Sequence, residues 1–169
     1  MSDPQTLQHY FLLGGLTGAD LWPAINIVLL SYLLLFFAPR WQWTPSLTLL
    51  TPLIHSVLYV GSLFSFMIDP VETPPEVDFT TLEGIATLFK DINVIFPAWI
   101  HYIVFDLLVA RMIVLDSIGR GASTLTHWLL VVPSAFCCFM YGPTGFLMYM
   151  ILREIVLPSK SGGEKIKIL

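Results

Sequence analysis

Asp106 is the residue of this sequence that points most directly to chemistry, because it lies at the centre of a long apolar segment. The segment reads PAWIHYIVFDLLVARMIVLD and also contains His101 and Arg111. A charge at the centre of a membrane-spanning helix costs about 2.5–3.5 kcal/mol on insertion scales, so such a residue normally has a function or a polar partner. Two interpretations are open: an intramembrane polar site, or hydrogen bonds from Asp106 and Arg111 that hold neighbouring helices together.

Helical geometry separates these three residues from one another. They are five positions apart each time, which places successive members about 140° apart around a helix axis. Asp106 instead shares its face with Trp99 and Tyr102. We therefore expect its polar partner to come from another segment. The candidates are His55, Tyr141 and Arg153, of which the mid-depth His55 fits best.

The two histidines His55 and His101 each allow two interpretations. An imidazole in an apolar helix can serve helix packing, or it can bind a metal, here the magnesium of a chlorophyll, because imidazole is a common metal ligand. No cysteine and histidine spacing of a protein metal site occurs, and the adjacent Cys137 and Cys138 point about 100° apart in a helix. We expect no protein-bound metal ion.

A Gly/Pro interruption, Tyr141-Gly142-Pro143-Thr144-Gly145, divides another apolar run near its middle. Non-helical backbone at membrane depth is tolerated only where protein or a cavity satisfies its polar groups. The interruption is therefore either a kink or a notch for a substrate.

The elements that must position these residues are membrane helices. The chain is 56% hydrophobic and only 12% charged, whereas soluble domains carry about 25% charged residues. Four apolar runs can cross a hydrocarbon core of about 30 Å at 1.5 Å per residue. They lie near residues 22–39, 46–68, 92–115 and 128–152. The sequence predicts an all-α polytopic membrane protein, a four-transmembrane-helix antiparallel bundle.

The remaining segments flank this bundle, which we expect over residues 22–155. Residues 1–21 are predicted to form an interfacial N-terminal segment, and residues 156–169 a basic soluble tail. An acidic, proline-rich connection follows the second run. The distribution of Lys and Arg favours both termini on one side of the membrane. The first twenty residues contain no Lys or Arg, so we expect no cleavable secretory signal.

Several function classes are excluded by charge and motif. The net charge is −4 and no basic cluster exists, which argues against nucleic-acid binding. The chain contains no GxSxG, Walker, dinucleotide-binding or HExxH motif. Soluble-enzyme chemistry of these kinds is therefore not expected.

Three stretches carry a family resemblance: LEGIATLF, AWIHYIVFDLLVARMIVLD and YGPTGFLMYMILREI. They resemble the abscisic-acid-deficient-four family, the neoxanthin synthase-like integral membrane proteins of photosynthetic organisms. The resemblance covers roughly residues 22–155. Its most specific part is the series Ala98-Trp99-Ile100-His101, Asp106-Leu107 and Ala110-Arg111 in one run, followed by Gly142-Pro143 and Gly145.

This resemblance implies a thylakoid or plastid membrane protein that converts violaxanthin into neoxanthin by isomerising a 5,6-epoxide to an allene, with no required cofactor. From the motif positions we expect Asp106 and His101 to supply the acid and the base, and Arg111 to stabilise the developing alkoxide. The residues expected to contact the substrate are Trp99, Tyr102, His55, Tyr141 and Gly142.

A second interpretation is a non-catalytic subunit that contacts pigments or lipids in a photosystem or light-harvesting complex. The aromatic content of 14% suits pigment packing and lipid-facing helices equally. In this interpretation the expected partners are membrane lipids, carotenoids and the surrounding complex, and a bound carotenoid or chlorophyll is a structural component.

Overall fold

The computed structural model describes residues 7–70 and 78–157, and four helices in this part are long and apolar enough to cross a membrane. These crossings are Gly18–Phe37, Thr44–Ile68, Ile92–Gly119 and Thr124–Tyr141. The prediction of an all-α membrane bundle with four spanning helices is confirmed. The predicted tail beyond Leu157 and the centre of the acidic connection lie outside the described residues.

The first crossing is a chain of three short helices that follows a small hairpin. Strands β1 (His9–Tyr10) and β2 (Leu16–Thr17) pair antiparallel around the 3-10 turn η1 (Phe11–Leu13). Thr17 and Asp20 then form a capping box that begins α1 (Gly18–Leu21). The 3-10 helix η2 (Trp22–Asn26) and α2 (Ile27–Phe37) complete the crossing.

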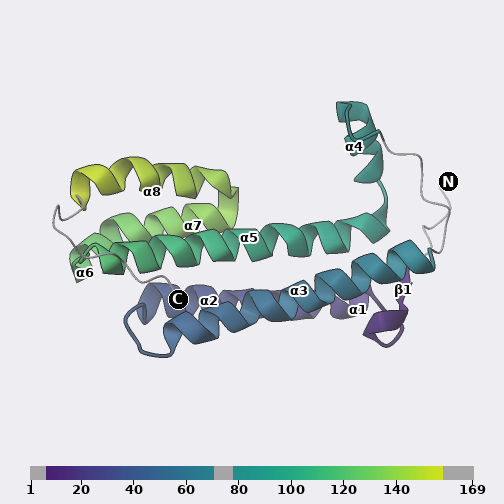
Figure 1. Cartoon of the computed structure of the whole chain (residues 1–169), viewed down its shortest axis with the longest axis horizontal. Helices are drawn as coiled ribbons and strands as arrows, with labels where there is room; N and C mark the ends of the chain where they lie inside the picture. Colours follow the sequence, from purple (N-terminus) through teal and green to yellow (C-terminus); the bar gives the residue numbers. More distant parts are fainter. Residues whose placement is uncertain (1–6, 71–77, 158–169) are drawn as a thin grey trace.

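Helices α3 (Thr44–Ile68) and α5 (Ile92–Gly119) lie side by side along most of their length (Figure 1). The Ser31 hydroxyl of α2 donates to the Thr51 hydroxyl of α3 over 2.7 Å inside the bundle. Helix α4 (Leu82–Leu88) follows α3 in the chain and stands away from the bundle at the beginning of α5 (Figure 1). Its first turn is capped by the Thr81 hydroxyl, which accepts from the Gly84 amide.

The fourth crossing ends earlier than predicted. It consists of α6 (Thr124–Thr126), the π-helical turn η3 (His127–Val131) and α7 (Val132–Tyr141). The chain then reverses, and α8 (Pro143–Val156) returns beside α7 (Figure 1). A single span over 128–152 is therefore wrong. The reversal occurs because Gly142 adopts φ +52°, which favours glycine, and Pro143 begins the new helix, where its missing N–H costs nothing.

This reversal also places the described chain ends at opposite ends of the bundle. The Gln8 backbone N–H donates to the side-chain oxygen of Asn93, and the Gln8 side chain donates to the Asp69 carbonyl. The Leu157 carbonyl accepts from Arg120, just beyond the other end of α5. The prediction that both termini share one side is therefore wrong for the described ends, because it did not include the return of α8.

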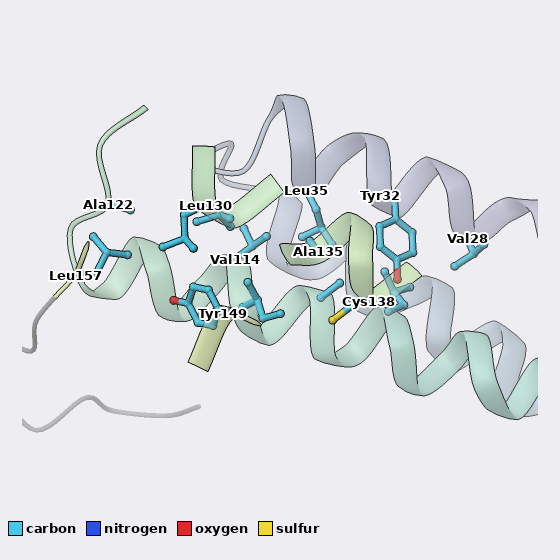
Figure 2. Close-up of a cluster of buried hydrophobic side chains, with 14 residues drawn as sticks. Val28, Tyr32, Leu35, Val114, Ala122, Leu130, Ala135, Cys138, Tyr149 and Leu157 are labelled. Atoms are coloured by element: carbon cyan, nitrogen blue, oxygen red, sulfur yellow. The ribbon is translucent and has the colours of Figure 1, made fainter. Parts of the chain in front are cut away.

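The core that holds α8 in place is drawn in Figure 2. Buried side chains from α2, α5, α7 and α8 form one cluster, with Tyr32, Leu35, Ala135 and Tyr149 among them. Gly145 allows α8 to approach α7 closely, because a β-carbon at this position would collide with the α7 backbone at Ser134 and Cys138. The fold thus depends on a small residue where the two helices meet.

Candidate functional site

Asp106 lines a pocket of about 600 Å³ that opens between the first crossing, α5 and the α7–α8 turn. Three chain segments far apart in sequence therefore contribute to one cavity. Its lining consists of Trp22, Ile25, Asn26, Val28, Leu29, Trp99, Tyr102, Ile103, Asp106, Phe139, Met140, Tyr141, Gly142 and Pro143. We call this cavity the Asp106 pocket.

Aromatic side chains form much of the wall of the Asp106 pocket. Trp22 and Trp99 stack with ring centroids 6.2 Å apart and planes 28° from parallel. Tyr102 and Tyr141 add phenol rings from α5 and α7. Such a wall suits an apolar, flat ligand, and its few polar groups can orient that ligand.

The carboxyl group of Asp106 is half-buried and makes no hydrogen bond or ion pair within the part of the chain that the structure describes. The partner expected from His55, Tyr141 or Arg153 is absent there, although Tyr141 lines the same pocket. Tyr32 of α2 and Cys138 of α7 lie near this carboxyl group. The carboxyl oxygens of Asp106 are therefore available to a ligand.

Tyr32 adds a buried hydroxyl near this carboxyl. Its side chain is 4% exposed, and its oxygen has no hydrogen-bond partner among the described residues. The ring packs against Phe139 of α7 with centroids 4.8 Å apart, and Figure 2 shows it reaching from α2 into the bundle beside Cys138. Sequence reasoning did not select Tyr32, because no local pattern marks a tyrosine whose importance comes from the neighbouring helices.

Gly142 belongs to the wall of the Asp106 pocket. The interruption predicted as a kink or a substrate notch is a full reversal of the chain, and it brings the backbone of Gly142 next to the carboxyl of Asp106. Of the residues expected to contact a substrate, Trp99, Tyr102, Tyr141 and Gly142 thus gather in one pocket with Asp106.

His101 lies in a different pocket. It faces a groove of about 480 Å³ between α3, α4 and α5, lined mainly by apolar and aromatic side chains. The rings of Tyr59, Tyr102 and Phe105 lie with centroids 4.9–6.0 Å from the imidazole. Tyr102 lines both pockets, whereas His101 and Asp106 share neither. The structure does not bring these two residues together as an acid–base pair.

Arg111 and His55 also lie outside the Asp106 pocket. The Arg111 guanidinium donates to the Pro45 carbonyl through Nη2 at 3.0 Å, which joins α5 to the first turn of α3. His55 is buried, and its Nδ1 lies 2.8 Å from the Thr51 carbonyl oxygen. The Arg111 contact is of the helix-packing kind that the sequence left open, whereas the His55 contact lies within α3 and leaves the buried Nε2 of His55 without a hydrogen-bond partner among the described residues.

Comparison with known families matches residues 21–149 to the ABA DEFICIENT 4-like family. The chain belongs to this family. The match covers more than half of the chain and includes every residue that lines the Asp106 pocket. No curated protein and no solved structure matches the chain.

This ABA DEFICIENT 4-like chain also has a charged cluster that sequence reasoning missed. Oδ2 of Asp116 accepts from Arg120 at 3.1 Å, from Arg153 at 3.1 Å and from the Tyr149 hydroxyl at 2.7 Å. Glu154 pairs with both arginines at 3.0–3.1 Å. The four-residue spacing of Asp116 and Arg120 was a usable sequence signal for the first of these pairs.

The charged cluster fastens the end of α8 to the end of α5. Burial lowers the pKa of Arg120, but the carboxylates of Asp116 and Glu154 outweigh it, so this pKa is raised above its ordinary value. The arginine therefore stays charged and paired. In this ABA DEFICIENT 4-like chain the cluster stabilises the return of α8, and with it the turn that closes the Asp106 pocket.

Proposed function

We propose that this chain is a neoxanthin synthase-like, carotenoid-associated protein of a plastid or thylakoid membrane, which isomerises the 5,6-epoxide of a xanthophyll to an allene. The observation that carries the proposal is the Asp106 pocket. It combines aromatic, apolar walls with one carboxyl group that has no hydrogen-bond partner among the described residues. An apolar ring needs such walls, and proton transfer needs such a group. Family membership supports the same activity.

The reaction transfers protons and breaks one C–O bond without redox change. A base removes the proton from the vinylic carbon beside the ring. The electron pair of that C–H bond forms the second double bond of the allene, while the epoxide C–O bond at the adjacent ring carbon breaks. The oxygen remains on the other ring carbon and takes up a proton to become a hydroxyl. The site therefore needs a base and a proton donor.

Within the Asp106 pocket we assign the base to the Asp106 carboxylate. Tyr102 and Tyr141 line the same cavity, and a phenol can donate a proton or a hydrogen bond to an opening epoxide oxygen. The proposal does not require His101 or Arg111, which lie elsewhere. The catalytic roles expected for those two residues from the motif positions stay predictions.

Expression in a host that makes violaxanthin but no neoxanthin tests the activity. Pigment chromatography should detect a new allenic product with the unaltered chain. Asp106→Asn should give no product at equal amounts of folded membrane protein, because an amide cannot accept the proton. His101→Ala, as a matched change on the same helix, should retain the product. An unchanged carotenoid profile with the folded, unaltered chain would refute the isomerase.

The second candidate function is a non-catalytic, pigment- or lipid-contacting subunit of a photosystem or antenna complex. The groove at His101 favours it, because this groove holds an imidazole without a hydrogen bond in the described part of the chain and is surrounded by aromatic rings. Here a carotenoid or a chlorophyll would occupy the groove. Co-purification of the chain and pigment with a large complex, without any allenic product, would support this function over the isomerase.

A further inference from the structure

We infer that Asn26 forms a subsite in the Asp106 pocket that binds a hydroxyl group on the ring of the ligand. Asn26 ends η2 on the wall contributed by the first crossing, whereas Asp106 is on α5. The subsite deepens the proposed function and rests on it for the identity of the ligand. It predicts selectivity for hydroxylated over unhydroxylated rings.

The backbone of Asn26 offers no reason for an asparagine at this position. Asparagine is favoured at helix N-caps, where its side-chain oxygen accepts from the helix backbone. Asn26 has helical backbone angles, φ −64° and ψ −14°, and its side chain makes no capping hydrogen bond. Inside a helical run asparagine is a poor helix former. The amide is therefore not explained by local structure.

The surroundings of Asn26 make its amide costly. Asn26 lies near the middle of the first crossing, where its exposed side chain lines the Asp106 pocket beside Trp22, Ile25 and Leu29 and has no hydrogen bond within the described residues. An amide that is exposed at this depth of a membrane has no water to bond, and without a hydrogen bond it loses roughly 1–3 kcal/mol relative to water. A ligand that supplies this bond would recover the loss.

The chemistry of the pocket selects the class of ligand group. An amide carries donors and an acceptor and no charge, so it matches a hydroxyl, which can both donate and accept. A phosphate or carboxylate is disfavoured, because the pocket contains the acidic Asp106 and no Lys or Arg among its lining residues. A lipid headgroup phosphate therefore fits this position less well than the hydroxyl of an apolar ring.

Binding of two pigments to the purified chain tests the subsite without requiring turnover. Violaxanthin carries a ring hydroxyl, and β-carotene 5,6-epoxide lacks it. The unaltered chain should prefer violaxanthin. Asn26→Leu preserves the side-chain size and should weaken violaxanthin binding by about tenfold, the equivalent of about 1.4 kcal/mol, while binding of the unhydroxylated epoxide stays the same or improves.

Leu29→Ala is the matched control, because Leu29 lines the same pocket without a polar group. It should weaken both pigments equally. Equal weakening of both pigments by Asn26→Leu, or no preference in the unaltered chain, would overturn the subsite. Preference for violaxanthin without formation of an allene would support the subsite and refute the isomerase activity. An allene formed at unchanged rate and selectivity by folded Asn26→Leu would support the isomerase activity and refute the subsite.

Discussion

Gly142 and Asp106 lie so close together that a β-carbon built at position 142 would be 3.3 Å from Oδ1 of Asp106. The same glycine has the positive φ that reverses the chain between α7 and α8. One residue thus links the path of the backbone to the shape of the pocket around the carboxyl group. A change at this position should affect stability and ligand binding together.

Gly142→Ala should destabilise the protein by about 1–3 kcal/mol, because a residue with a β-carbon is strained at this φ. It should also crowd Asp106 and weaken pigment binding. Thermal unfolding in detergent and pigment titration measure the two effects. Gly119→Ala is the control, since nothing lies within 4 Å of a β-carbon there and its φ is not positive. Equal behaviour of the two variants would contradict the role of Gly142.

Arg111→Met should lower stability by about 1–3 kcal/mol, because it removes the charged donor to the Pro45 carbonyl. Product formation per folded molecule should stay unchanged, since Arg111 does not line the Asp106 pocket. Quantifying folded protein by size-exclusion chromatography beside the pigment assay separates the two effects. Loss of product at normal stability would instead restore the catalytic role expected from the motif.

Asp116→Asn should loosen α8, because one carboxylate oxygen accepts from two arginines and a tyrosine. We expect the free energy of unfolding to fall by about 1–3 kcal/mol. The lower end of this range is favoured because the cluster is partly exposed. Thermal unfolding measures the loss. The control is Glu83→Gln, which changes an exposed acid at the beginning of α4 and should leave the midpoint of thermal unfolding unchanged. A cluster without influence on α8 would give the same midpoint for both variants.

Single cysteines can test the return of α8. In a background with Cys137→Ala and Cys138→Ala, an impermeant thiol reagent should label Gly119→Cys and Val156→Cys from the same side of the membrane. Thr80→Cys should be labelled from the opposite side, because α5 crosses between it and Gly119. A continuous fourth span through residue 152 would put positions 119 and 156 on opposite sides. That labelling pattern would refute the reversal at Gly142.

The sequence by itself determined the membrane class, the number of crossings and the face of Asp106. These features depend on local physics: apolar runs need lipid, and a period of 3.6 residues puts Trp99 and Tyr102 on the face of Asp106. The structure retains this grouping, since all three side chains line one pocket. The Gly-Pro pair also marked the position of the break, because both residues disturb a helix regardless of their neighbours.

Only the tertiary structure decided which segments complete the pocket. The direction of the chain after Gly142 depends on its φ and on the close approach of Gly145 to the α7 backbone, which no local pattern encodes. Which helices pack against each face of α5 decides that His101 and Asp106 line different pockets. It also decides that Asn26 lines the Asp106 pocket. Helical periodicity orders the residues of one helix, whereas their partners follow from the packing of all the helices together.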